Sequence, residues 1–145
     1  MKQTVIIRPA RLSDLDAIFV ILREVASRIP TNLSTPEHVN EMHKQIKESY
    51  FDGFSIVATD VNGAIVGFQL SQKQHWFEET YVKLAYAGVT AAFENKGIFR
   101  RLIEAMKQHS LPLVAEVLPG NKSAMSLRLE RYGFERVGDT YRWQP

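Results

Sequence analysis

A glycine at the start of a predicted helix is the clearest chemical signal in this sequence. An apolar stretch that ends near Val89 runs into the turn Glu94-Asn95-Lys96-Gly97, and an amphipathic helix follows. The first turn of a helix presents unpaired backbone N–H groups and the positive end of the helix dipole, and a glycine lets an anion approach them without meeting a Cβ atom. The turn therefore favours a phosphate-bearing ligand bound by the main chain; an ordinary strand-to-helix turn is the alternative interpretation.

Hydrophobic periodicity predicts the elements that position this turn. Short apolar and β-branched runs predict the strands. They are Thr4 to Arg8, Phe54 to Thr59, Ala64 to Ser71, Tyr81 to Thr90, Leu113 to Leu118 and, as a closing hairpin, Phe134 to Val137 and Thr140 to Trp143. The Asn62-Gly63 pair between the second and third strands is typical of a tight antiparallel hairpin.

Apolar residues at three- and four-residue steps predict four helices. The first helix follows the cap Ser13 and reaches Pro30, and the second follows Thr35 and reaches Tyr50. The third begins after Gly97, and the fourth follows the cap Asn121 and reaches Gly133. Asp16 gives the first helix a variant of the capping box. A strand, the third helix and another strand form a parallel crossover, so that helix begins at the carboxyl end of the fourth strand, where α/β sheets bind ligands.

Composition limits the class of protein. The 145 residues, 45% of them hydrophobic, predict one globular domain over residues 1–145. A net charge of +2, from 18 basic and 16 acidic residues spread along the chain, gives no field that would gather nucleic acid. The chain has no cysteine, no apolar run long enough for a membrane span and no signal peptide, so a soluble cytoplasmic protein is expected. His38 and His43 fall on different sides of their helix, and no metal site is predicted.

Two segments together resemble a known family. Val89 to Ile103 is similar to the phosphate-binding motif of the GNAT superfamily of N-acyltransferases, and Asn121 to Phe134 is similar to its following helix motif. Ile7 to Ala17 and Gly63 to Phe68 resemble the family's first strand and helix and the turn into its third strand. The resemblance implies an α/β fold whose mixed, mostly antiparallel sheet of six or seven strands is flanked by four helices. It also implies acetyl-CoA as cosubstrate, with no metal.

The family's phosphate-binding signature falls on the turn with one outright match. The signature has Gln or Arg first, Gly three residues later, and Gly or Ala two residues after that. These three positions are Glu94, Gly97 and Phe99 in this chain, and only Gly97 fits. Because backbone N–H groups make the contact, the resemblance still implies a set of cofactor-binding residues. They are Val89, Glu94, Asn95, Lys96, Gly97, Ile98, Phe99, Arg100 and Asn121. Phe99 is expected to point toward the core, Glu94 to repel a diphosphate, and Arg100, Arg101 and Lys122 to flank the phosphates.

The resemblance also implies aminolysis of a thioester. The acceptor amine must be neutral to attack, so a base is needed, and a backbone N–H near Val89 would stabilise the oxyanion. Glu116 and Tyr86 are the first candidates for the base, and Glu78 and Glu79 are further candidates. Each of the four also fits an ordinary sheet or loop position. The tyrosine that protonates the departing thiolate in many relatives falls on Arg128 or Leu129 here, which leaves Ser126 or water for that role.

The leading interpretation is an N-acetyltransferase that moves an acetyl group from acetyl-CoA to an amine of a small molecule or peptide by direct attack on the thioester. The first alternative is an acyl-CoA-binding or sensing module with the fold but little catalysis, and the second is a site for another phosphate metabolite. The loops Arg28 to Thr35 and His75 to Glu79 are expected to shape the acceptor pocket. A homodimer is implied by the resemblance.

Overall fold

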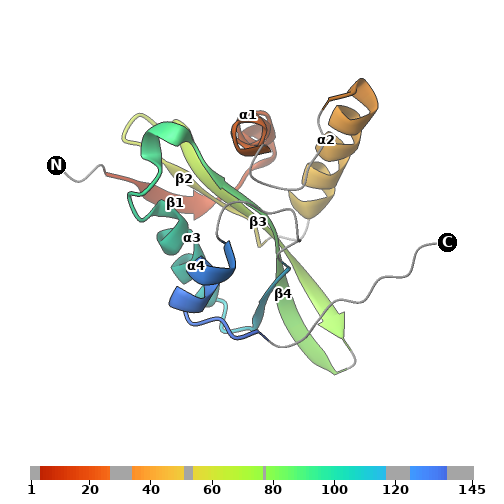
Figure 1. The fold of residues 1–145 in the computed structure, drawn as a ribbon, viewed down its shortest axis with the longest axis vertical. Helices are drawn as coiled ribbons and strands as arrows, with labels where there is room; N and C mark the ends of the chain where they lie inside the picture. Colours follow the sequence, from red (N-terminus) through yellow and green to blue (C-terminus); the bar gives the residue numbers. More distant parts are fainter. Residues whose placement is uncertain (1–3, 27–33, 51–53, 77, 117–124, 137–145) are drawn as a thin grey trace.

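A five-stranded sheet forms the centre of the computed structural model, which describes residues 4–26, 34–50, 54–76, 78–116 and 125–136. Its strands lie in the order of the sequence (Figure 1). They are β1 (Ile6–Pro9), β2 (Ile56–Thr59), β3 (Ile65–Trp76), β4 (Glu79–Val89) and β5 (Leu113–Ala115). Neighbouring strands are antiparallel except β4 and β5, which are parallel, so the expected mixed, mostly antiparallel sheet is confirmed.

Among the described residues, four α-helices flank the sheet, as expected. They are α1 (Leu15–Val25), α2 (Pro36–Tyr50), α3 (Ile98–Lys107) and α4 (Met125–Arg131). Figure 1 shows α1 and α2 on one side of the sheet and α3 and α4 on the other. Because α3 connects β4 to the parallel strand β5, the crossover expected from the sequence is also confirmed.

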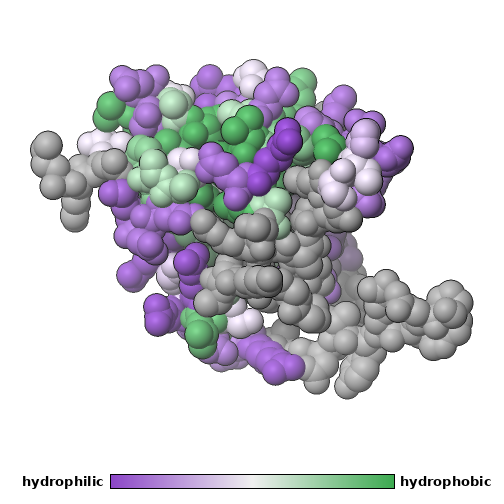
Figure 2. Space-filling model, turned by 45° about the horizontal axis from the view of Figure 1, so that its top comes forward, coloured by the Kyte–Doolittle hydropathy of each residue, from purple (hydrophilic) through white to green (hydrophobic). Residues whose placement is uncertain are grey.

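Two apolar clusters attach the helices to the two faces of the sheet. Ile18 and Leu22 of α1 pack with the fully buried Phe68 of β3 on one face of the sheet. Ile98 and Leu102 of α3 pack with residues of the opposite face, such as Val66 of β3. On the molecular face in Figure 2, hydrophilic side chains surround smaller areas of hydrophobic ones. The apolar stripes read from the sequence are therefore the surfaces that pack on the sheet. Within the described ranges, no helix has the length and apolar composition needed to span a bilayer.

The β2–β3 turn follows the sequence prediction closely. Gly63 has a φ of 83°, and the carboxylate of Asp60 accepts hydrogen bonds from the backbone N–H groups of Asn62 and Ala64 at 2.9 and 3.0 Å. Gly63 thus supplies the positive φ, and Asp60 the hydrogen bonds, of the tight turn that two antiparallel strands need. Thr35 likewise accepts a hydrogen bond from the N–H of His38 at 3.2 Å, as expected of the cap of α2.

The start of α1 differs from the sequence prediction. A 3-10 helix, Leu12–Asp14, precedes α1, and Ser13 lies exposed within it. Asp14 occupies the N-cap position of α1 but makes no side-chain hydrogen bond to that helix. Its carboxylate instead accepts a hydrogen bond from the Arg11 N–H, at the start of the 3-10 helix, at 2.7 Å and two from the Arg8 guanidinium at 2.8 and 2.9 Å. The cap at Ser13 was therefore wrong, because Asp14 combines the N–H contact with an ion pair to β1 that Ser13 cannot make.

Asp14→Asn is expected to lower the free energy of unfolding by about 2 kcal/mol at pH 7, because charge-assisted hydrogen bonds to a nearly buried carboxylate are lost. The hydrogen bond from Arg8 holds the pKa of Asp14 below its ordinary value. The stabilisation is therefore complete above the unfolded-state pKa of about 4 and is lost as the pH falls through the lower, folded-state pKa. Urea unfolding at pH 7 and pH 3 should show the difference between wild type and variant shrinking at the lower pH. Asp16→Asn, at an exposed position in the first turn of α1, is the control and should cost no more than the helix-dipole contribution of about 0.3 to 1 kcal/mol.

The segment expected as a loop after Ser71 is a strand. β3 continues to Trp76 and β4 begins at Glu79, and His75 Nδ1 lies 2.9 Å from Thr80 Oγ1 across this hairpin. The loop expected over His75 to Glu79 is therefore reduced to the end of the β3–β4 hairpin. Pro30, residues 117 and 118 of the predicted fifth strand, and most of the predicted C-terminal hairpin lie outside the described residues, and residues 134–136 have no regular secondary structure.

Candidate functional site

The turn after β4 has the backbone geometry expected of a main-chain anion site. A 3-10 helix, Ala91–Phe93, leads to Asn95 and Gly97, whose φ angles of 60° and 80° are both left-handed. Apart from Gly97 itself and its two neighbours in the chain, no described residue has a heavy atom within 4 Å of the position that a Cβ on Gly97 would take. The N–H of Arg101 donates to the carbonyl of Gly97 at 3.1 Å, so the N–H groups of Ile98 to Arg100 precede the first intrahelical bond.

Contacts from α1 hold the beginning of this turn. The carboxylate of Glu24 accepts hydrogen bonds from Thr90 Oγ1 at 2.9 and 3.1 Å and from the N–H of Ala91 at 3.2 Å. The Thr90 N–H donates to the carbonyl of Val66 on β3 at 2.9 Å. The turn is thus fixed to two elements before the chain enters α3.

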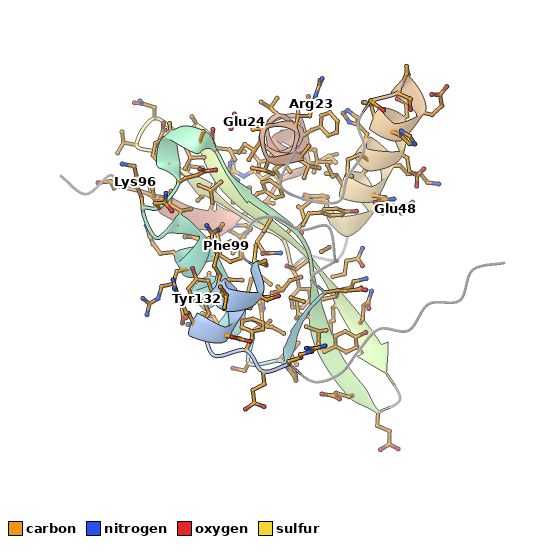
Figure 3. The ribbon with its side chains drawn as sticks, viewed as in Figure 1. Arg23, Glu24, Glu48, Lys96, Phe99 and Tyr132 are labelled. Carbon is orange, nitrogen blue, oxygen red and sulfur yellow. The ribbon has the colours of Figure 1, made fainter. Side chains whose placement is uncertain are left out.

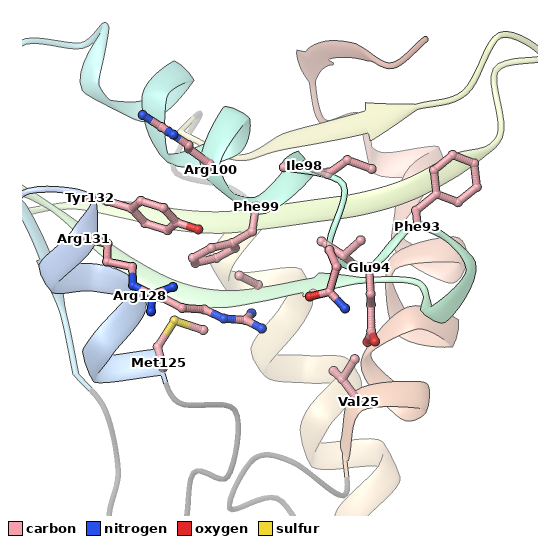
Figure 4. Close-up of a pocket in the computed structure, with 15 residues that line it drawn as sticks. Val25, Phe93, Glu94, Ile98, Phe99, Arg100, Met125, Arg128, Arg131 and Tyr132 are labelled. Atoms are coloured by element: carbon pink, nitrogen blue, oxygen red, sulfur yellow. The ribbon is translucent and has the colours of Figure 1, made fainter. Parts of the chain in front are cut away.

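A cavity of about 300 Å³ lies at the carboxyl end of β4, between α3 and α4 (Figure 4). Its walls come from the end of β4, the turn, the first residues of α3, the α4 region and one residue of α1. They are Ala87, Gly88, Val89, Phe93, Glu94, Asn95, Gly97, Ile98, Phe99, Arg100, Met125, Arg128, Arg131, Tyr132 and Val25. The chain segments of the two resembling motifs therefore meet around one pocket.

Most of the turn residues predicted from the sequence line this pocket. Of the proposed cofactor-binding residues, seven are in its wall, from Val89 to Arg100, whereas the exposed Lys96 is not. Asn121 and Lys122 lie outside the described residues. Arg101, expected to flank the phosphates, instead donates a hydrogen bond to the carbonyl of Val5 at 2.9 Å, which directs it to the N-terminal side of the sheet.

Phe99 does not point toward the core, so that expectation was wrong. Its side chain is half-buried and lines the pocket, and its ring centroid lies 5.8 Å from that of Tyr132. Both side chains are labelled in Figure 3. The buried face of α3 begins one residue earlier, at Ile98, and continues through Leu102 and Met106. Because one residue is about 100° of helical rotation, Phe99 is turned from the core into the pocket.

The two candidate bases lie apart from the pocket wall. The hydroxyl of Tyr86 donates a hydrogen bond to Gln45 Oε1 of α2, and burial, together with the negative charge of Glu41, raises the pKa of this tyrosine. Glu116 is exposed and follows β5 directly. The structure therefore does not bring these side chains together with the turn and α3.

Sequence reasoning missed the contribution of α4 to the pocket. Met125, Arg128, Arg131 and Tyr132 line it, whereas the resemblance concerns Arg128 only as one of two residues at the family's tyrosine position. The three-residue spacing of Arg128 and Arg131 places both on one side of a helix, and this was the available signal. In the described part of the chain, no group of three or more histidine, aspartate or glutamate side chains is arranged to hold a metal ion.

Comparison with solved structures identifies the fold. A possible acetyltransferase from Clostridium difficile 630 is 18% identical over 97% of both chains, with a TM-score of 0.77. An acetyltransferase of the GNAT family from Streptococcus agalactiae 2603 is 15% identical over 95% of this chain and 89% of its own, with a TM-score of 0.74. The structure of AAC(6')-Iy with the bisubstrate analogue CoA-S-monomethyl-acetylneamine is 15% identical over 98% of both chains, with a TM-score of 0.71.

Sequence comparisons add nothing to this result. No family model matches the chain, and no curated protein matches it. The structural similarity is therefore carried by the arrangement of the elements rather than by shared residues. The chain has the fold of the GNAT acetyltransferases.

Proposed function

We propose that this protein is an N-acetyltransferase that moves an acetyl group from acetyl-CoA to an amine of a small molecule or peptide. The observation that carries the proposal is the pocket at the end of β4, where the Gly97 turn faces the arginines of α4 within a GNAT fold. Two similar structures support the choice of cosubstrate: AAC(6')-Iy was solved with CoA and with a CoA-linked bisubstrate analogue. The same structures concern an aminoglycoside N-acetyltransferase, which is consistent with a small amine as acceptor.

In this proposal, the first turn of α3 binds the diphosphate of acetyl-CoA. The backbone N–H groups from Gly97 to Arg100 face the phosphates, since α3 makes its first internal hydrogen bond only at Arg101. Val89 and its neighbours at the end of β4 line the pocket beside that turn and accommodate the acyl end of the ligand. Asn121 is assigned to the same ligand on the resemblance alone.

The proposed reaction is direct attack of the amine on the thioester. The nitrogen lone pair forms a bond to the acetyl carbonyl carbon, the C–S bond breaks, and the CoA thiolate leaves and takes up a proton. The attacking nitrogen loses its own proton to a base, and an N–H near Val89 stabilises the oxyanion before the C–S bond breaks. No covalent enzyme intermediate is needed, which agrees with the absence of cysteine from the sequence.

Glu116 is the first candidate for the base and Tyr86 the second. Tyr86 acts as a base only after losing its proton, and both burial and Glu41 oppose that loss by raising its pKa. We therefore expect Glu116→Gln to slow thiol release from acetyl-CoA at least about tenfold near neutral pH, with recovery at high pH, where the amine is already neutral without the help of a base. Tyr86→Phe is the matched comparison. Thiol release followed from pH 6 to pH 10 separates them, and a larger loss in Tyr86→Phe would transfer the role to Tyr86.

An acyl-CoA-binding or sensing module remains the alternative function, favoured by the absence of tyrosine at positions 128 and 129 and by Glu94 in the pocket wall. Titration of the full chain with acetyl-CoA, followed by thiol release with a panel of amines, separates the possibilities. Binding with turnover supports the transferase, and binding without turnover supports the module. The absence of CoA binding would favour another phosphate metabolite and reject both.

A single domain over residues 1–145, a homodimer and a cytoplasmic location remain predictions of the sequence.

A further inference from the structure

The charged side chains of the pocket are distributed unevenly between its two walls. Glu94, on the turn, is the acidic residue of the lining, and Arg100, Arg128 and Arg131 are the basic ones. Lys96, the basic residue of the turn itself, is exposed and does not line the cavity. The turn therefore contributes a negative side chain, and the positive side chains come from α3 and chiefly from α4.

The three guanidinium groups have no hydrogen-bond or ion-pair partner among the residues that the structure describes. All three side chains are exposed, so water screens their mutual repulsion, and their N–H groups are available to a bound anion within reach. The lining thus carries three positive side chains against one negative one, which favours an anionic ligand in addition to the backbone geometry at Gly97.

Arg128 is the arginine placed to reach such a ligand. Figure 4 shows its side chain extending from α4 into the pocket, in the direction of the turn that carries Glu94. Arg100 extends along α3 away from the middle of the pocket, and Arg131 lies nearer to Tyr132. An anion at the start of α3 would therefore have backbone N–H groups on one side and the Arg128 guanidinium on the other.

We propose that Arg128 binds the diphosphate of the coenzyme from the α4 side of the pocket. A planar guanidinium donates two parallel hydrogen bonds to phosphate oxygens, and its charge offsets that of Glu94 across the cavity. This inference rests on the proposed coenzyme A site. The turn begins with the negatively charged Glu94, so its first side chain does not bind a phosphate. The inference assigns that side-chain contact to α4 instead.

Calorimetric titration with three ligands tests the assignment. Coenzyme A, dephospho-coenzyme A, which lacks the 3′-phosphate, and desulfo-coenzyme A, which lacks the thiol, all retain the diphosphate. Arg128→Gln is expected to weaken all three by the same factor of about 10 to 30, as expected for a charge-assisted contact. Glu94→Gln, which removes a negative charge from the opposite wall, is expected to tighten all three several-fold.

The control is Arg23→Gln, which removes an exposed arginine of α1 outside the pocket and should leave the three affinities unchanged. Arg128→Lys keeps the charge without the two parallel donors and should give an intermediate loss. Because Arg128 is exposed, its variants should melt at the wild-type temperature.

Each other outcome overturns the assignment. Arg128→Gln binding coenzyme A within twofold of the wild type would remove Arg128 from the site. A loss with coenzyme A but not with dephospho-coenzyme A would assign Arg128 to the 3′-phosphate, and a loss confined to the thiol-bearing ligands would assign it to the sulfur. Failure of the wild-type protein to bind any of the three would instead reject the proposed function, and this result is distinguishable because it does not involve the variant.

Discussion

Acetyl-CoA is expected to bind Gly97→Asp at least about 100-fold more weakly than the wild-type protein, because juxtaposed like charges cost several kcal/mol. The aspartate places a carboxylate in the pocket wall at the start of α3, where the proposed diphosphate approaches the main chain. Its Cβ also occupies the space that the anion needs, since only a glycine leaves that backbone uncovered. Calorimetric titration of both proteins measures the effect.

Two control variants separate this effect from a disturbance of the fold. Gly63→Asp introduces the same side chain at a similar φ of 83°, with equally open space around its Cβ, in the β2–β3 turn. It should show the same modest backbone strain with unchanged binding. Gly97→Asn keeps the bulk but not the charge and should lie between wild type and Gly97→Asp. Wild-type affinity in Gly97→Asp would show that no anion contacts this turn.

The backbone part of the site could be predicted from the sequence because its chemistry is local. A strand followed by a glycine and an amphipathic helix predicts a helix start with free N–H groups, wherever the rest of the chain lies. The left-handed φ angles of Asn95 and Gly97 and the start of α3 at Ile98 agree with that prediction. The same argument explains the success at the β2–β3 turn, where the positive φ of Gly63 and the hydrogen bonds to Asp60 all lie within five consecutive residues.

The side-chain part of the site could not be predicted, because it depends on how α3 and α4 pack together. Whether Phe99 faces the core or the pocket is decided by about 100° of helical rotation, and the apolar pattern of α3 is compatible with either. Arg128 enters the pocket only because α4 lies against it. A pattern of residues on one helix carries no information about the neighbour that this helix faces.

The outer half of the β3–β4 hairpin was missed for another physical reason. Alternation of polar and apolar residues appears where one face of a strand is buried, and this part of the hairpin extends beyond the helices (Figure 1). Lys73 and His75 are exposed, and Gln72 and Gln74 are half-buried. Because the partly covered face carries the polar residues Gln72 and Gln74, the sequence shows no alternation of polar and apolar residues, and the strand is instead maintained by pairing with β4.

Phe68→Ala is expected to lower the free energy of unfolding by about 4 kcal/mol and the melting temperature by about 10 to 20 °C. Phe68 is fully buried on β3, in the cluster that joins α1 to the sheet, and its loss leaves a cavity that the surrounding strands cannot close. Chemical and thermal unfolding measure the loss. Val20→Ala, at a 59% exposed position of α1, is the control and should cost less than about 1 kcal/mol.

The same side chain explains why position 88, in the wall of the pocket, is a glycine. Gly88 pairs with Phe68 across β3 and β4, and a Cβ added to it would lie 3.0 Å from Phe68 Cε1 and 3.3 Å from Ile21 Cγ2. Gly88→Ala should therefore cost about 1 to 3 kcal/mol alone, and less when Phe68 is already alanine. A double-mutant cycle of the two substitutions measures this coupling, and purely additive costs would contradict it. The packing that holds α1 on the sheet thus also determines which residue can stand beside Val89 in the pocket.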